Sequence, residues 1–233
     1  MAKDGKGDVV VVKRVASFQE HMGKPLPPSF LAEKELTALQ SLHNAGITNV
    51  PELAYPDVIE VDGGFAVITK YKDGYTSFNG IKSLLLREVS GQIDSHILED
   101  SYNSLANIHS VDRIHGDLHL DNIGVVPPTS PDKIADVFLI DFELSNDLSD
   151  PKYSNKYSAK IGDVMNFTAH LLYMFSNDTK SYEDVSEKLI TVVSEKLKRG
   201  YFEYLNLTVP ANLELELEVQ YQIVSAQMRS IGR

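Results

Sequence analysis

Residues 115–122 read His-Gly-Asp-Leu-His-Leu-Asp-Asn and gather polar side chains in one short stretch. Residues 139–143 read Leu-Ile-Asp-Phe-Glu, so a second acidic stretch follows a run of apolar residues. Clusters of histidine, aspartate and asparagine are common in loops, and each stretch alone could be a polar turn capped by carboxylates. The two stretches in this order, each beside an apolar strand, are far more specific.

The first stretch resembles the catalytic loop of the protein-kinase superfamily, whose pattern is H-x-D-L-x-x-x-N. Asp141-Phe142-Glu143 is similar to the D-F-G metal motif of that superfamily, with Glu143 in place of glycine. The resemblance implies an α+β, bilobal protein-kinase-like fold with a reduced β-rich N-lobe and a small helical C-lobe. It also implies an ATP-dependent kinase that uses Mg²⁺.

The resemblance assigns a role to each polar residue of the two stretches. Asp117 accepts or orients the proton of the attacking hydroxyl, as a general base does. Asn122 and Asp141 carry oxygen atoms of the kind that bind Mg²⁺. His115 is expected to brace the loop. His119 stands where typical Ser/Thr kinases carry lysine, so the contact with the γ-phosphate is left open.

Upstream, residues 9–14 read Val-Val-Val-Val-Lys-Arg and resemble the strand that carries the ATP-binding lysine. Lys13 would contact the α- and β-phosphates; the alternative is a solvated strand end. Its partner would be a glutamate on the following helix. Glu35 fits the family's helix pattern best because Leu39 follows it, and Glu33 is the alternative.

Two further segments match the superfamily's layout. Residues 65–71 resemble the strand and hinge that bind adenine, with Thr69 as gatekeeper and backbone groups of Lys70 and Tyr71 bonded to the base. Asp163 resembles the helix aspartate that braces the catalytic loop, although it can also be a carboxylate at the start of a helix.

The chain departs from the family pattern in three places. The segment before Lys13 is too short for a Gly-rich phosphate loop, and Gly5 and Gly7 are expected to form a turn. Gly116 replaces the arginine that often precedes the base and pairs with a phosphorylated activation loop. The segment 142–162 is short and contains no A-P-E motif.

The periodicity of apolar residues predicts a small β-rich half followed by a helical half, divided as residues 1–72 and 73–233. Expected strands cover 9–12, 57–61, 65–70 and 137–140, with a hairpin turn at 62–64. Expected helices cover 30–44, 94–110, 161–176, 181–199 and 211–228. Ser29 is the expected cap of the first helix.

Composition excludes several classes of protein. The net charge of −11 disfavours nucleic-acid binding, which needs an electropositive face. No apolar run approaches the roughly 18 residues of a membrane span. The chain has no cysteine and no secretory h-region, which favours a reducing, cytoplasmic location. Delivery into a host cell as an effector is not readable from the sequence.

Three functions fit the pattern. The first is a minimal, atypical Ser/Thr protein kinase, resembling small bacterial effector kinases and the small kinase of the KEOPS complex. The second is a small-molecule kinase resembling the aminoglycoside and choline kinases, in which His119 and the Asp-Phe-Glu triplet are frequent. The third is a nucleotide-binding pseudokinase. The short segment 73–116 favours a protein substrate, and a partner is expected to complete the missing phosphate cover.

Overall fold

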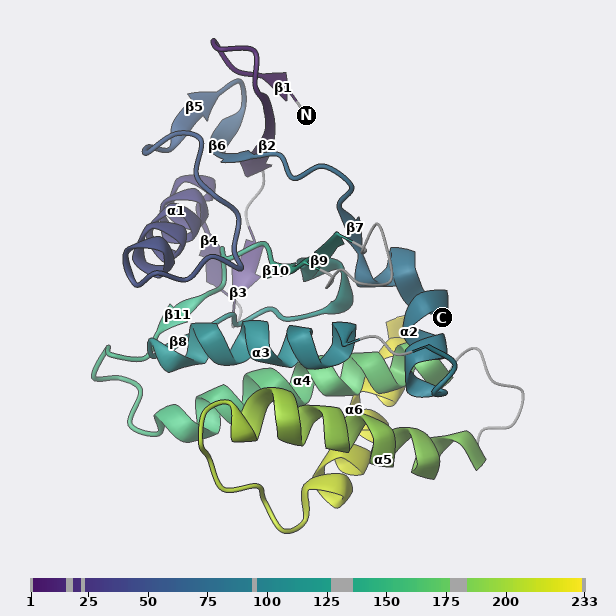
Figure 1. The fold of residues 1–233 in the computed structure, drawn as a ribbon. Coiled ribbons are helices and arrows are strands. Elements are labelled where there is room, and N and C mark those ends of the chain that lie inside the picture. The colour runs from purple at the N-terminus through teal and green to yellow at the C-terminus, as the bar shows by residue number, and fades with distance from the viewer. Residues whose placement is uncertain are drawn as a thin grey trace.

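The N-terminal part of the computed structural model is a four-stranded antiparallel sheet with one helix beside it (Figure 1). The structure describes residues 2–15, 19–21, 24–93, 96–126, 136–176 and 184–231. The strand order is β1-β2-β6-β5, and the bounds are β1 Ala2–Lys3, β2 Val9–Val15, β5 Ile59–Val61 and β6 Gly64–Lys70. A separate hairpin pairs β3 Gln19–His21 with β4 Lys24–Leu26.

The β-branched run forms β2, as the sequence predicts, but the strand continues past Lys13 to Val15. Lys13 therefore lies inside the strand, opposite Val67 of β6. The predicted hairpin of β5 and β6 is confirmed, and Gly63 turns it with a φ of +76°. That left-handed backbone favours glycine, which has no Cβ to clash.

The helix α1, Pro28–Asn44, packs on the sheet and buries Leu31, Leu39 and Leu42. The predicted cap at Ser29 is wrong, because the helix already begins at Pro28 and its cap position is Pro27. A proline in the first turn fits there, since the first amide groups of a helix have no partner within it.

Residues 71–75 connect β6 to the second part of the chain, and the division that we predict after residue 72 lies within this connection. That division stays a prediction. The second part is mainly helical, with α2 Lys82–Val89, α3 Ile97–Ser110, α4 Lys156–Ser176, α5 Asp184–Leu197 and α6 Leu213–Ile231. Single turns of other helix types lie at η1 Phe78–Ile81, η2 Leu120–Asn122 and η3 Lys198–Glu203.

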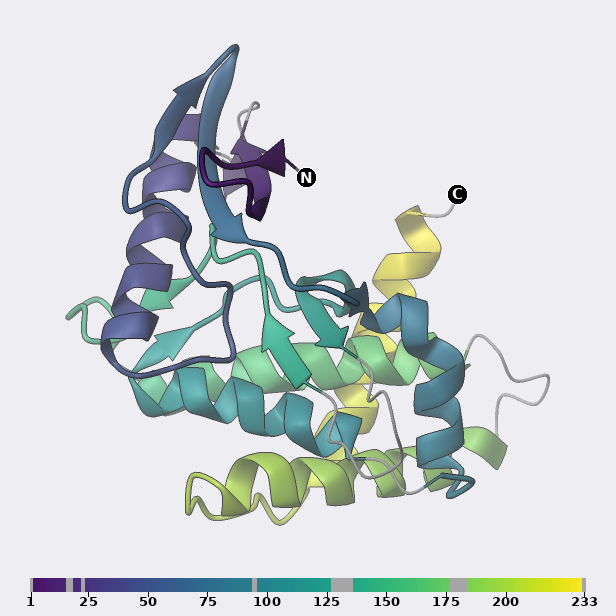
Figure 2. The same cartoon turned by 45° about the horizontal axis from the view of Figure 1, so that its top comes forward.

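The predicted helices are present, with shifted ends. The helix α4 begins at Lys156, five residues before the prediction, and α6 runs from 213 to 231. The predicted residues 94–95 and 181–183 lie outside the described residues. In Figures 1 and 2 the long helices lie below the sheet, and α6 crosses behind α4 and α5.

A small sheet of three strands lies between the large sheet and the helices (Figure 2). Its strands are β7 Thr76–Ser77, β9 Ile123–Val126 and β10 Asp136–Leu139, in the order β10-β9-β7. Gly124 packs so tightly that an added Cβ would lie 2.7 Å from the Phe138 ring and 2.4 Å from that of Tyr75. A further pair, β8 Arg113–Ile114 with β11 Asn146–Asp147, ties the two polar loops together.

Aromatic rings fill the centre of the helical part. Phe167 of α4 packs edge-on against Tyr102 and Phe78, with ring centroids 5.4 Å and 6.0 Å away. All three rings are fully buried. Among the described residues, no helix combines the length and apolar character that a bilayer crossing requires. The predicted α+β class is confirmed, with a β-rich N-terminal part followed by a mainly helical part.

Candidate active site

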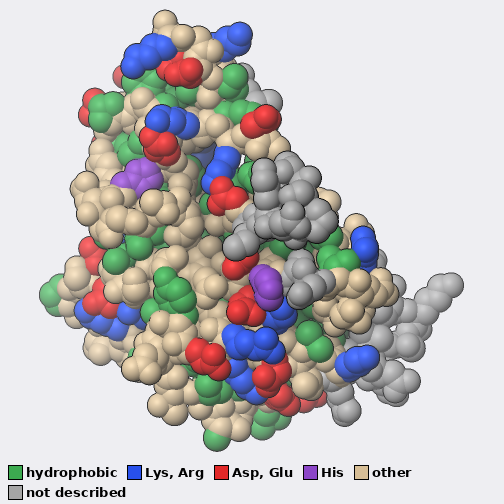
Figure 3. All heavy atoms as spheres, viewed as in Figure 1, with side chains coloured by type: hydrophobic (Ala, Val, Ile, Leu, Met, Phe, Trp, Pro, Cys, Tyr) green, Lys and Arg blue, Asp and Glu red, His purple; other side chains and the backbone are tan. Residues whose placement is uncertain are grey.

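A cavity of about 570 Å³ opens between the large sheet and β10, and it is called the interlobe pocket below. Charged side chains of both signs run down the middle of the face seen in Figure 3, from the sheet to the helices. Apolar side chains from both lobes form much of the pocket wall: Val11, Val50, Val67, Phe138 and Ile140. An apolar wall with a few charged groups at one end is typical of a small-molecule site.

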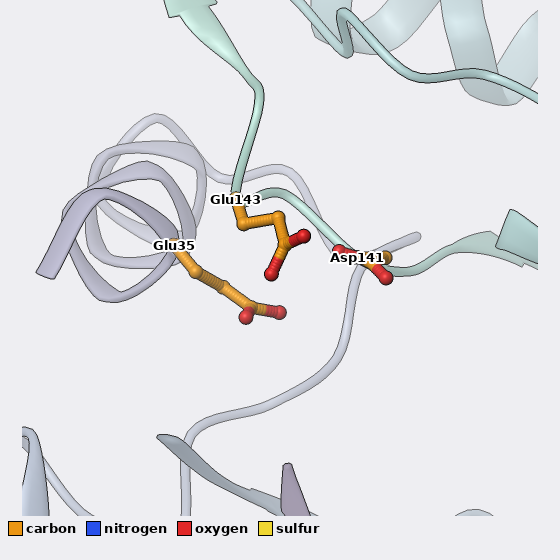
Figure 4. Close-up of side chains that lie close together, drawn as sticks. All are labelled: Glu35, Asp141 and Glu143. Atoms are coloured by element: carbon orange, nitrogen blue, oxygen red, sulfur yellow. The ribbon is translucent and has the colours of Figure 1, made fainter. Parts of the chain in front are cut away.

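Lys13 occupies the charged end of this pocket, surrounded by three carboxylates. Its Nζ lies 2.8 Å from Glu35 Oε2, 2.5 Å from Asp141 Oδ1 and 3.2 Å from Glu143 Oε2. In Figure 4 the three acidic side chains converge, Glu35 from α1 and the other two from the loop after β10. The sequence-predicted residues of the two lobes therefore meet at one point, while the alternative partner Glu33 is exposed.

The electrostatics of this group follow from an excess of negative charge. Burial alone would lower the pKa of Lys13, but the nearby carboxylates of Glu35 and Asp141 outweigh burial and raise it. Lys13 is therefore an ammonium ion. Burial raises the pKa of Glu35, and the charge of Lys13 only partly opposes that rise.

The loop between β8 and β9 presents Asp117 and His119 to solvent, with side chains 44% and 38% exposed. The amide of Asp121 donates a hydrogen bond to His119 Nδ1 over 3.3 Å, which leaves the proton on Nε2. That Nε2 lies 3.8 Å from Asp117 Oδ2. Neither Asp117 nor His119 lines the interlobe pocket.

Asn122 is buried and ties the two polar loops together. The side-chain Nδ2 of Asn122 donates to the backbone carbonyl of Asp117 over 2.8 Å. The backbone carbonyl of Asn122 accepts from the amide of Ile140 over 2.9 Å. Since the amide nitrogen is used in this way, the side-chain oxygen is the atom left to hold a cation. Asp141 offers a carboxylate oxygen from the adjacent loop, and both residues thus carry oxygen donors of the kind that Mg²⁺ prefers.

His115 acts as the brace that the sequence predicts. Its Nε2 donates to the carbonyl of Ile140 over 2.8 Å, and its ring packs on Phe142 with centroids 4.7 Å apart. Burial lowers the pKa of His115, so the ring is neutral. The two loops that carry Asp117 and Asp141 are thus joined by an uncharged contact.

Asp163 braces the same loop from α4. Its carboxylate accepts the amides of His115 over 2.8 Å and of Gly116 over 3.1 Å, and it lies 3.2 Å from Nε2 of His109. Burial would raise the pKa of Asp163, but its bonds with His109 and His115 outweigh burial and lower it. Asp163 stands inside the helix, so the brace interpretation is confirmed and the helix-start alternative is wrong.

The hinge residues line the interlobe pocket, but their amides are already bonded. The amide of Lys70 donates to the carbonyl of Glu52 over 2.8 Å, and that of Tyr71 donates to the carbonyl of Val9 over 3.2 Å. Adenine would therefore need other groups of Lys70 and Tyr71, such as their carbonyl oxygens. Thr69 also lines the pocket, as expected for a gatekeeper.

The turn with Gly5 and Gly7 joins β1 to β2, as predicted. Asp4 Oδ1 accepts the amides of Lys6 and Asp8, both over 2.9 Å. This turn precedes Val9, beside the hinge, while Lys13 lies farther along β2. Among the residues that the structure describes, this turn therefore does not cover the position of the phosphates.

Sequence reasoning missed two parts of the site. The motif comparison treats Glu143 as a departure from D-F-G and as a feature of small-molecule kinases, and it does not predict the contact of Glu143 with Lys13. Thr48 and residues 50–52 line the interlobe pocket, and nothing in their composition marks them. They reach it because Leu53 pairs with Thr69 at the edge of the sheet.

No protein-family model matches the chain, and no curated protein matches it. A solved structure described as WaaP in complex with acyl carrier protein is 17% identical, with a TM-score of 0.48, and the match covers 82% of this chain and 76% of that one. A second, described as the crystal structure of BubR1 kinase domain, is 15% identical, with a TM-score of 0.46, and covers 96% and 74%. At these identities the likeness concerns the arrangement of the chain alone.

Proposed function

We propose that the chain is an ATP-dependent phosphotransferase, and specifically an atypical Ser/Thr protein kinase. The observation that carries the proposal is the ammonium of Lys13, held between Glu35 of one lobe and Asp141 of the other at the end of a 570 Å³ pocket. Phosphoryl transfer depends on positioned groups and compensated charge rather than on covalent chemistry. A fixed cation beside an oxygen donor set meets both needs.

In this proposal each residue has one task. Lys13 contacts the α- and β-phosphates, Glu35 holds Lys13, and the apolar wall receives adenine near Lys70 and Tyr71. Asn122 and Asp141 hold Mg²⁺, which would neutralise phosphate charge in the site.

The reaction itself takes place in front of Asp117. The hydroxyl of the acceptor gives its proton to the Asp117 carboxylate, and its oxygen bonds to the γ-phosphorus. The bond from that phosphorus to the bridging oxygen breaks, and ADP leaves.

The surface around Asp117 supports a protein acceptor. The carboxylate is 44% exposed and lies outside the interlobe pocket. Between the hinge and α3, the described elements are the short strand β7, the single turn η1 and the short helix α2. A peptide segment can lie across such an open surface. We propose that a partner protein completes the cover over the phosphates.

A small-molecule kinase is the second candidate, favoured by the part that Glu143 plays in the Lys13 group. The deciding experiment supplies labelled ATP and Mg²⁺ with a library of Ser/Thr peptides and, separately, with amino sugars and choline. Transfer to peptides that is lost in Asp117→Asn is the expected result.

Other outcomes of the same experiment identify the alternatives. Transfer to the small molecules alone would support the second candidate. Calorimetric binding of Mg·ATP without any transfer would identify a pseudokinase. Absence of nucleotide binding in a folded protein would overturn all three.

A further inference from the structure

Glu143 is a buried charge with no task in the proposed reaction. Its side chain is only 8% exposed, and its Oε2 lies 3.2 Å from Lys13 Nζ. Lys13, Glu35 and Asp141 all line the interlobe pocket, whereas Glu143 does not. The Glu143 carboxylate therefore approaches the ammonium from beside the pocket lining, and Figure 4 shows it next to Glu35 and Asp141.

Burying a carboxylate is unfavourable unless an opposite charge compensates it. Lys13 lies within ion-pair distance of both buried glutamates, 2.8 Å from Glu35 and 3.2 Å from Glu143. Asp141 is 31% exposed and faces the pocket, so it is the carboxylate of the three that a bound cation can take from Lys13. The two buried glutamates would then be the protein groups that still hold the ammonium.

We propose that Glu143 is a positioning residue that shares the hold on Lys13 with Glu35, so that either glutamate alone keeps the ammonium in the pocket. The inference rests on the proposed function for its consequence, since Lys13 is held in order to meet phosphates. The contact itself does not depend on that function, and it can be tested without nucleotide.

The first test measures thermal unfolding of the nucleotide-free protein. In the wild type, Glu143→Gln removes an attractive partner of Lys13 and lowers Tm by about 2–4 °C, the shift that a loss of about 1 kcal/mol causes in a chain of this size. In a Lys13→Met background the three carboxylates repel one another, so the same exchange raises Tm. A reversal of sign is expected from a charge contact and not from loss of packing.

Glu52→Gln is the matched control for this test. Glu52 also lines the pocket, but it pairs with Lys70 at the surface, where the Glu52 side chain is 62% exposed. Its effect on Tm should be small and equal in both backgrounds, since exposed pairs contribute little. A fall in Tm of the same size for Glu143→Gln in both backgrounds would overturn the inference.

The second test measures the affinity for Mg·ATP by calorimetry in excess Mg²⁺, where the cation engages Asp141 and the two glutamates are left to hold Lys13. Glu35→Gln and Glu143→Gln each weaken binding by no more than about threefold, and the double variant weakens it by thirtyfold or more. In the Lys13→Met background neither exchange weakens affinity further.

Two results of the second test would contradict shared holding. One is a loss in Glu35→Gln alone as large as that in the double variant. The other is a loss of affinity in the double variant that equals the product of the losses in the two single variants. If the wild type binds no ATP, the proposed function fails, while the Tm reversal still decides whether Glu143 holds Lys13.

Discussion

Asp141 has a backbone conformation that non-glycine residues seldom adopt, with a φ of +68°. Such a conformation costs of the order of 1–3 kcal/mol and persists only where the surroundings impose it. Here the next residue, Phe142, is fully buried under His115, and His115 bonds the carbonyl of Ile140. The strain turns the Asp141 carboxylate toward Lys13 and the pocket.

Replacing this carboxylate should abolish Mg²⁺-dependent nucleotide binding while leaving the fold intact. We expect Asp141→Ala to weaken Mg·ATP binding at least tenfold, which corresponds to about 1.4 kcal/mol. Calorimetry on a protein that keeps its cooperative urea transition provides the measurement. Asp150→Ala, which removes an exposed carboxylate, is the control. Unchanged Mg·ATP affinity in folded Asp141→Ala would remove Asp141 from the metal site.

In the proposed reaction Asp117 acts on the acceptor and not on the nucleotide, so its loss should affect turnover. We expect Asp117→Asn to lower kcat by about 10²–10⁴, the usual contribution of a general base. The Kd for ATP should stay within about twofold, since Asp117 lies outside the interlobe pocket. Steady-state kinetics and calorimetry on both proteins decide the matter, and equal turnover would show that Asp117 is not the base.

The sequence predicts the chemistry-bearing residues better than their contacts. The spacing in 115–122 and 139–143 predicts roles for Asp117, Asn122 and Asp141 because the motif is local, and these roles stay predictions. The bonded amides of Lys70 and Tyr71 depend on strand register with Val9 and on Glu52, and no local pattern encodes that register. Glu143 was missed for the same reason, since its partner Lys13 is far away in the chain.

Among the elements, α3, α4 and η3 meet at a buried polar chain. Tyr201 of η3 bonds Nδ1 of His109 over 2.5 Å, and Nε2 of His109 faces Asp163, which holds the catalytic loop. The His109 ring is fully buried, and burial lowers its pKa despite the contact with Asp163. A neutral ring then donates a hydrogen bond from Nε2 to Asp163 and accepts one at Nδ1 from the Tyr201 hydroxyl.

This neutral histidine predicts how stability depends on pH. Unfolded His109 gains a proton as pH falls below about 6.5, while the folded ring, with its lowered pKa, does not. The free energy of unfolding therefore decreases as pH decreases through that window, by up to about 1.4 kcal/mol per pH unit from this group.

His109→Gln should remove that contribution. Urea unfolding at pH 7 and pH 5 should show a smaller loss of stability in this variant than in the wild type. The control is His170→Gln, which replaces an exposed histidine of α4. An identical loss in wild type and His109→Gln would mean that His109 is charged in the folded protein.

Apolar periodicity predicts five of the helices and the strands β2, β5, β6 and β10, but not the short helix α2 or short strands such as β1 and β7. Two further details depend on contacts that periodicity does not encode. The start of α1 depends on proline in the first turn, which the pattern at Ser29 obscured. The π-helical turn η3 depends on Gly200, where a Cβ would lie 2.6 Å from the carbonyl of Glu99. Such close approach of two helices is a tertiary contact and leaves no periodic signal.

At the scale of the whole molecule, the surroundings of Arg113 bear on whether phosphorylation of residues 142–162 could regulate the protein. Arg113, which could in principle replace the missing arginine beside the base, is buried between Ser145 and Asp147, 3.4 Å and 3.7 Å away. A phosphate within residues 142–162 would have to displace these contacts before it met that guanidinium. Control by a partner or by substrate supply fits this arrangement better.

We therefore expect full activity without phosphorylation of this segment. Active protein is treated with phosphatase, its mass is checked for complete removal of phosphate, and its activity is measured again. The rate should change by less than about twofold. A tenfold loss that is restored by phosphate within 142–162 would show that the segment is a switch.

Gly116 has a φ of +82°, and a Cβ there would lie 2.4 Å from the carbonyl oxygen of Leu144. In evolutionary terms, a single substitution of Gly116 by arginine is therefore disfavoured, because its Cβ would have to displace the backbone at Leu144. A descendant of this protein could acquire arginine-based control only after β11 had already moved. Its regulation is more readily inherited through new partners than through new residues in the catalytic loop.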